Sequence, residues 1–238
     1  MELIGEVAAW FADPGNWSGT NGIPNRLVEH LRLSGASMLV ATLVALPVGL
    51  AIGHTGRGGF LAVAVANLGR AVPSYALLLV FLPIFGLGDA AAFPALVLLA
   101  IPPILVNAYT GLRGVDRDLV EAGRGMGMTE LQLLLRVELP AAAPVIVAGL
   151  RLAAVAVVAT ATLAALVAGG GLGRYIADGF GLRREDRLIA GAILVALLAL
   201  VVERAFTFAE RRTLLPGDHR RPSAADLAPP PPGTVAQP

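Results

Sequence analysis

Residues 31–53, LRLSGASMLVATLVALPVGLAIG, form a stretch of apolar and small side chains with a single charge, at Arg32. The apolar positions do not alternate with polar ones, which argues against a half-buried strand. A helix of this length covers the ~30 Å hydrocarbon core of a bilayer and satisfies its own backbone hydrogen bonds there. We therefore predict that this stretch is a membrane-spanning helix.

Four further stretches of the chain share this character. They are residues 60–85, 93–112, 141–168 and 188–208. Charged residues make up only 15% of the 238 residues and hydrophobic ones 56%, whereas soluble domains contain about 25% charged residues. The sequence therefore predicts an all-α integral membrane protein with five transmembrane helices, in a domain that comprises residues 31–212.

The segments outside the spans have distinct compositions. Residues 1–30 begin with acidic residues and lack the basic start of a cleavable signal peptide. We predict that they form an N-terminal extracytoplasmic segment, which follows from the N-out orientation derived below. Residues 213–238 are polar and Pro-rich, which predicts a disordered cytoplasmic tail. Residues 113–140 form a polar loop between the third and fourth spans.

The loop arginines predict the orientation, because basic residues concentrate on the cytoplasmic side of membrane proteins. If the C-terminus is inside, the inner arginines are Arg57, Arg113, Arg117, Arg124, Arg136, Arg204, Arg211, Arg212, Arg220 and Arg221. The outer arginines are then Arg26, Arg32, Arg174, Arg183, Arg184 and Arg187. The inner set is larger, which predicts an N-out, C-in topology, although the Arg-rich loop between the fourth and fifth spans opposes the trend.

Composition argues against several classes of protein. A net charge of +1 argues against a nucleic-acid partner. The chain has no cysteine, and His30, His54 and His219 lack ligand spacing, so we predict no metal site. The spans contain no Asp, His or Lys, which leaves a membrane-embedded enzyme without a catalytic dyad. The glycine run at residues 169–173 lacks the Lys-Ser/Thr of a phosphate-binding loop, and we interpret it as a flexible outer gate or turn. We expect no catalytic residue and no cofactor.

The polar loop carries a spaced pattern: Glu121-Ala122-Gly123, three residues, Gly127, nine residues, then residues 137–140, Val-Glu-Leu-Pro. Leu131, Leu134 and Leu135 recur at helical spacing, which predicts a short amphipathic helix outside the bilayer.

The residues of this pattern each have a physical interpretation. Ala122, Gly123 and Gly127 are small, so another protein can approach the backbone closely there. Gly127 also suits a turn between two helical pieces, because glycine tolerates positive φ. Glu121 offers a charged anchor. Pro140 suits the first turn of the fourth span, where its missing N–H costs nothing.

This pattern resembles the EAA loop of the permeases of ABC importers, whose usual form is E-A-A, three residues, G, nine residues and I-x-L-P. Gly123 and Val137 depart mildly from it. Residues 111–151, together with RAVPSYALL at 70–78 and AGGGLGRYI at 168–176, resemble the osmoprotectant branch, which transports glycine betaine, carnitine and choline.

The resemblance implies the type I importer fold, with five core helices and a cytoplasmic coupling helix, in a bacterial inner membrane. It implies that the loop docks on ABC ATPase subunits, with the coupling residues Glu121, Ala122, Gly123, Gly127, Leu139 and Pro140. It also implies a second permease subunit, identical or related, an extracytoplasmic substrate-binding protein and surrounding membrane lipid. Alternatives are a permease for another small solute, such as a methionine-like amino acid, or a membrane subunit without a transport role.

Polar residues within the spans suggest a pathway. A charge in a span costs about 2.5–3.5 kcal/mol at the membrane centre and is a functional candidate by default. Arg70 precedes Pro73, which can break the helix and expose carbonyls to a cavity. We predict as pathway-lining residues Arg70, Ser74, Tyr75 and Asn107. The alternatives are that Arg70 extends to the interface and that Asn107 forms hydrogen bonds between helices.

The aromatic content suggests where selectivity resides. Quaternary ammonium groups are often held in aromatic cages, but aromatic residues make up only 5% of the chain, and Tyr75, Tyr109 and Tyr175 are dispersed. Selectivity is therefore expected to belong mainly to a separate binding protein.

Overall fold

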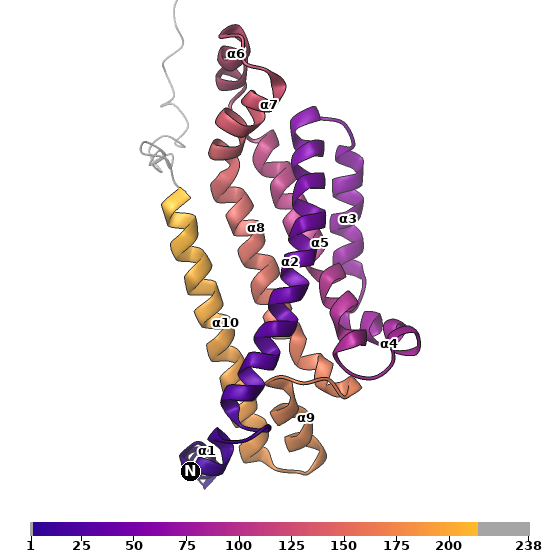
Figure 1. Ribbon diagram of the computed structural model, residues 1–238, viewed down its shortest axis with the longest axis vertical. Helices are drawn as coiled ribbons and strands as arrows, with labels where there is room; N and C mark the ends of the chain where they lie inside the picture. Colours follow the sequence, from indigo (N-terminus) through magenta and orange to yellow (C-terminus); the bar gives the residue numbers. More distant parts are fainter. Residues whose placement is uncertain (1, 214–238) are drawn as a thin grey trace, which may run out of the picture.

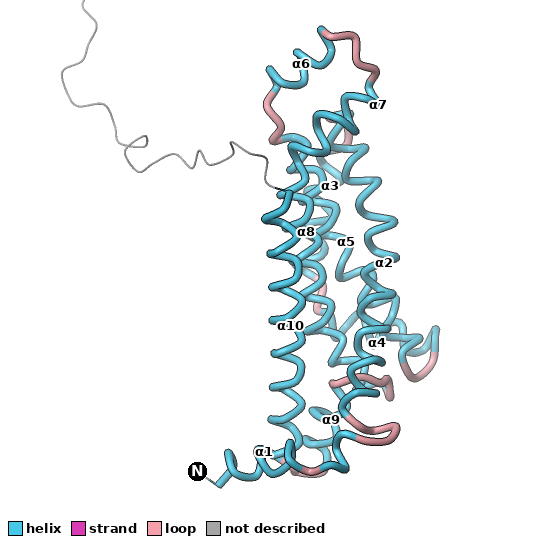
Figure 2. The backbone as a smooth tube through the Cα atoms, turned by 60° about the vertical axis from the view of Figure 1, so that its left-hand side comes forward, coloured by secondary structure: helices cyan, strands magenta, loops and turns pink. Residues whose placement is uncertain are grey.

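The computed structural model describes residues 2–213, which are helical and contain no strand (Figures 1 and 2). The elements in chain order are α1 (Glu2–Ala12), η1 (Pro14–Trp17), α2 (Ile23–Thr55), α3 (Gly59–Ala71), α4 (Ser74–Phe85), α5 (Asp89–Arg113), α6 (Arg117–Gly125), α7 (Glu130–Leu133), η2 (Leu134–Glu138), α8 (Leu139–Thr160), η3 (Ala161–Val167), α9 (Gly173–Gly181) and α10 (Glu185–Thr213). Helices α6 and α7 form one end of the long bundle, and α1 and α9 lie at the other end.

The predicted spans are present as helices. Within the described residues, α2, α5, α10 and the continuous run from Glu130 to Val167 are long and apolar enough to cross a membrane. Helices α3 and α4 pass the same test as a pair that bends by 90°. The predicted break at Pro73 is confirmed: Val72 is extended, as the residue before a proline prefers, and α4 starts after Pro73. The all-α fold with five candidate spans is therefore confirmed.

Some element boundaries differ from the prediction. Helix α2 begins at Ile23, within residues 1–30 that we predicted to lie outside the membrane, and those residues also contain α1. The predicted fourth span, 141–168, corresponds to α8 followed by the 3₁₀ helix η3. Apart from Thr213, the predicted tail at 213–238 lies outside the described residues.

Helix α5 lies at the centre of the bundle and packs against its neighbours through small residues. A Cβ added to Gly49 of α2 would lie 2.7 Å from both the Leu105 carbonyl oxygen and the Ala108 Cβ of α5. A Cβ added to Gly149 of α8 would lie 2.4 Å from the Asn107 Cβ. Small residues let membrane helices approach closely, because lipid supplies no hydrophobic force between them. Glycines therefore set the close crossings of α2 and α8 with α5.

Arg151 connects α8 to α10. Its guanidinium lies 3.3 Å from the Glu210 carboxylate and donates a hydrogen bond of 3.2 Å to the Thr207 hydroxyl. The two helices are thus joined by a cross-helix ion pair.

The glycine run after η3 is a fixed turn. The Gly170 amide donates to the Asp89 carboxylate of α5 (3.0 Å), and the Gly171 amide donates to the Glu29 carboxylate of α2 (2.8 Å). Gly171 has a φ of +84°, which favours glycine. Of the two predicted interpretations, a flexible gate or a turn, the structure shows the turn.

Candidate functional site

The α6–α7 tip, residues 117–133, projects from one end of the bundle (Figure 1). Asp116 caps α6 by accepting a 2.9 Å hydrogen bond from the Asp118 amide. Thr129 and Gln132 start α7 with a capping box in which each side chain accepts from the other residue's backbone amide. The tip therefore has defined helix ends on both sides of its turn.

Gly127 forms the turn between the two helical pieces, as predicted. Its φ is +80°. Its amide donates to the Arg124 carbonyl, and the Met128 amide donates to the Gly123 carbonyl. These two bonds make a Schellman motif, in which a left-handed residue satisfies the last carbonyls of a helix.

Replacing Gly127 with alanine is expected to weaken this turn by about 1 kcal/mol, because a Cβ disfavours positive φ. Amide hydrogen exchange at Met128 should then be about fivefold faster, since the bond to Gly123 opens more often. Gly125→Ala is the matched control, because Gly125 has no positive φ and open space around its Cβ position. Equal exchange in the two variants would contradict the role of Gly127.

The small size of Gly123 has an internal reason that the sequence did not reveal. Gly123 is buried, and an added Cβ would lie 2.8 Å from the Leu133 Cδ1. Leu133 is itself fully buried. The interpretation that Gly123 lets another protein approach is therefore wrong, because this residue packs α6 against the following helix. Ala122 and Gly127 are exposed, as that interpretation requires.

The tip exposes apolar side chains. Met126 is 72% exposed and Leu131 is 65% exposed, and Leu119 and Leu135 are also exposed. The predicted leucine stripe is only partly correct, since Leu131 and Leu135 face outward whereas Leu133, outside that stripe, is buried. The sequence analysis did not identify Met126 as a surface residue of the tip. Its apolar side chain next to the predicted turn at Gly127 was a signal that could have identified it.

A cavity of about 180 Å³ lies between the tip and the bundle. Its ionisable lining residues are His54, Arg113, Arg117, Glu121, Arg124 and Glu138. Glu121 is exposed and lies at this cavity among three arginines. His54 was not predicted to belong to the site, because it is far from the loop in sequence.

Leu139 and Pro140 follow the π-helical segment η2, in which the Leu139 amide donates to the Leu134 carbonyl five residues earlier. Both residues are half-buried. Pro140 lies in the first turn of α8, as predicted. However, α8 continues without a break from the helical run that begins at Glu130, so Thr129 rather than Pro140 starts the helix.

The predicted pathway residues do not form one cluster. The backbone of Arg70 belongs to the last turn of α3. Ser74 lies on a small cavity of about 10 Å³, which Thr160 also lines. Tyr75 is exposed. Asn107 donates to the Pro103 carbonyl of its own helix (2.7 Å) and packs beside Gly149. The pathway role of these residues stays a prediction.

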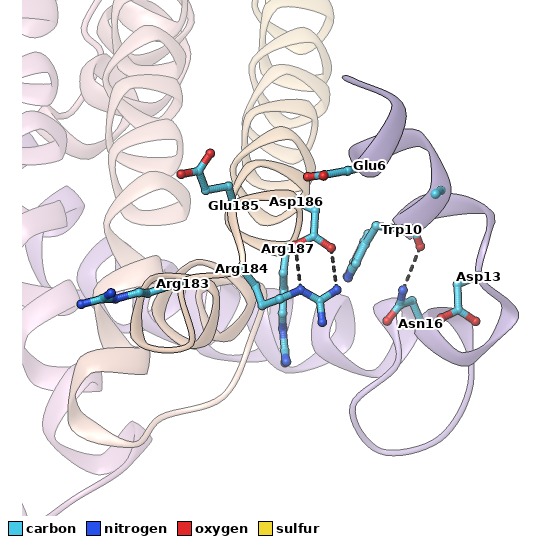
Figure 3. A pocket seen from close by; sticks show the side chains of 10 residues that line it. Glu6, Trp10, Asp13, Asn16, Arg183, Arg184, Glu185, Asp186 and Arg187 are labelled. Carbon is cyan, nitrogen blue, oxygen red and sulfur yellow. Dashed lines mark hydrogen bonds and ion pairs between the residues drawn. The ribbon is translucent and has the colours of Figure 1, made fainter. Parts of the chain in front are cut away.

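The opposite end of the bundle carries a larger cavity, of about 760 Å³, between α1 and the start of α10 (Figure 3). Side chains of both charge signs line it, including Glu6, Asp13, Arg184 and Asp186. Arg184 and Asp186 form a 2.6 Å ion pair, and hydrogen bonds to Asp186 raise the pKa of Arg184 above its ordinary value. This surface is polar and charged.

Helix α1 is fixed at this end by aromatic packing. The Trp10 ring meets the Tyr175 ring edge-on at 5.2 Å. The Tyr175 hydroxyl donates to the Asn21 carbonyl (2.6 Å), and burial raises the pKa of the Tyr175 phenol. The segment before α2 is thus part of the folded structure.

Comparison with known proteins places the chain in a family. Residues 41–215 match the family described as binding-protein-dependent transport system inner membrane component. The chain is 38% identical over 203 residues to the choline transport system permease protein OpuBB of Bacillus subtilis (strain 168), an alignment covering 84% of this chain and 94% of that protein. It is 43% identical over 184 residues to the carnitine transport permease protein OpuCB of Listeria monocytogenes, covering 77% and 84%.

Solved structures show the same architecture. A chain of the inward-facing MetNI methionine ABC transporter superposes with a TM-score of 0.69 at 25% identity, covering 79% of this chain and 94% of that one. This chain therefore belongs to the family of binding-protein-dependent transport system inner membrane components, the membrane permease subunits of ABC importers, and serves transport rather than catalysis.

Proposed function

We propose that this permease forms half of the translocation pathway for small osmoprotectants of the choline, carnitine and glycine betaine type. The observation that carries the proposal is the similarity to permeases named for these solutes, at 38% identity over 203 residues and 43% over 184. The proposed substrate class consists of quaternary ammonium compounds. Selectivity would lie mainly with a substrate-binding protein, in keeping with the few, dispersed aromatic residues.

The proposed docking surface for the ATPase subunits is the α6–α7 tip. Exposed apolar side chains at its end, Met126 and Leu131, suit insertion into a cleft of a partner protein. Glu121 and Ala122 are exposed on α6 and available for contact. Gly123, Gly127, Leu139 and Pro140 would act indirectly, by shaping the tip and its connection to α8.

The proposed orientation in the inner membrane is N-out and C-in, with the tip in the cytoplasm. The arginines at the α1–α9 end of the bundle argue against this orientation in the sequence. However, most of their charges are compensated by acidic residues nearby. They form ion pairs with neighbouring acids: Arg26–Glu29, Arg174–Asp178, Arg184–Asp186 and Arg187–Asp178. The charged 760 Å³ cavity at this end is the proposed contact surface for the binding protein.

A second candidate substrate class is an amino acid of the methionine type. The superposition on the MetNI methionine transporter at 25% identity favours it. The higher identity to choline and carnitine permeases favours the osmoprotectants.

The test is purification of the tagged chain from its native membrane, followed by reconstitution of whatever complex is recovered. We expect an ABC ATPase and a binding protein to co-purify, and ATP-dependent uptake of radiolabelled choline, carnitine or glycine betaine into liposomes. Uptake of methionine in preference to these solutes would replace the substrate class. Failure to recover an ATPase, even after crosslinking, would overturn the proposed coupling.

A further inference from the structure

His54 connects the long helix α2 to the α6–α7 tip. It lies in the last turn of α2, and its Nδ1 is 2.5 Å from the Glu138 Oε2. Its Nε2 lies 3.4 Å from the Glu130 Oε2, and that same oxygen is 3.3 Å from the Arg124 guanidinium. A chain of contacts thus runs from α6 through the start of α7 to α2, and from there to η2.

The two carboxylates have different environments. The Glu138 side chain is only 8% exposed, whereas that of Glu130 is 62% exposed. A buried carboxylate needs a partner, because its desolvation is otherwise uncompensated. An exposed ion pair contributes about 0–1 kcal/mol. The contact between His54 and Glu138 is therefore the strong member of the chain.

Glu138 lies in the π-helical segment η2, between the tip and α8. Such segments are rare and are frequent at functional sites. His54 also lines the cavity that contains Glu121, together with Arg113 and Arg117. The imidazole consequently lies where α2, the tip and the start of α8 meet. From this point α2 continues to Ile23 at the opposite end of the bundle.

We propose that His54 is a positioning residue for coupling: it ties Glu138 and the tip to α2, so that displacement of the tip by the ATPase moves α2. The proposal rests on the proposed docking of ATPase subunits at the tip. Each ring nitrogen of His54 faces one of the two carboxylates, Nδ1 facing Glu138 and Nε2 facing Glu130. In this role His54 affects the number of solute molecules transported per ATP hydrolysed. It contacts neither the solute nor the nucleotide.

The experiment measures solute molecules transported per ATP hydrolysed by the complete transporter in liposomes, with ATPase subunits and binding protein present. His54→Ala is expected to lower this ratio at least about fivefold, the lower end of typical coupling between sites. The ATPase subunits should still co-purify in the wild-type ratio, because Met126 and Leu131 of the tip are unchanged. Thr55→Ala is the matched control, since Thr55 is the exposed neighbour of His54 and its hydroxyl bonds only locally, donating to the Ala51 carbonyl and accepting from the Arg57 amide.

A swapped pair separates positioning from general damage. His54→Glu combined with Glu138→His restores an imidazole–carboxylate contact with the partners exchanged, and it is expected to recover coupling that either single substitution loses. If His54→Ala does not fold, the swapped pair and His54→Gln decide the question. A coupling ratio for His54→Ala equal to that of Thr55→Ala, or a folded swapped pair that stays uncoupled, would overturn the inference. Absence of ATPase binding to the wild-type chain would instead overturn the proposed function.

Discussion

Replacing Glu121 with lysine is expected to abolish ATP-driven uptake while the chain still inserts into the membrane. Glu121 is exposed on α6 and shares the cavity at the base of the tip with Arg113, Arg117 and Arg124. A lysine there adds a fourth cation and removes the acidic group that, in the proposed docking, contacts the ATPase. Losing one partner of a buried interfacial charge pair costs about 2–5 kcal/mol, so uptake should fall by about thirtyfold or more.

Two further variants make this result specific. Glu121→Gln removes the charge with little change in shape, and it should retain the fold while reducing ATPase binding. Asp118→Lys reverses another exposed acid on the same helix, which does not line the cavity, and uptake should stay within about twofold of wild type because exposed charges contribute little. Normal uptake by Glu121→Lys, measured with a wild-type amount of chain in the membrane, would refute the docking role.

Replacing Gly49 with valine is expected to have the largest effect on stability. Its Cβ would lie 2.7 Å from the Leu105 carbonyl oxygen and from the Ala108 Cβ. Those contacts are to the backbone and to a short side chain of α5, neither of which can rotate away. Overpacking typically costs about 1–3 kcal/mol, and a branched side chain at a backbone contact should lie at the upper end. The measurement is the free energy of unfolding in mixed detergent and sodium dodecyl sulfate.

Gly35→Val is the matched control for this prediction. Gly35 lies on the same helix and has a negative φ, and no atom lies within 4 Å of its Cβ position. The same substitution should therefore change the free energy of unfolding by less than about 1 kcal/mol. If both variants were equally stable, the close crossing of α2 and α5 would not be a determinant of the fold.

Local features of the fold were predictable from the sequence. Apolar length identified the spans, because the thickness of the hydrocarbon core sets how many helical residues cross it. Pro73 identified the break between α3 and α4, and Gly127 the turn of the tip. In each case the cause lies within a few residues of the effect.

Pairings between distant segments were not predictable in the same way. Gly123 was interpreted as space for a partner, but Leu133 fills that space from within the chain. The glycine run at 169–173 was compatible with a flexible gate until Glu29 and Asp89 were seen to bind two of its amides. The same residue types serve either purpose, and only their neighbours decide between them.

The sequence by itself determined that this is a helical membrane protein with an EAA-type loop, because hydrophobic length and motif spacing are properties of contiguous residues. Only the tertiary structure decided that His54 meets Glu138, 84 residues away, and that Gly49 lies against the backbone of α5. These contacts depend on how each helix is rotated and how closely it packs. A helix that is apolar on every side does not encode its rotation in its hydrophobic pattern, so packing against the neighbouring helices must set it.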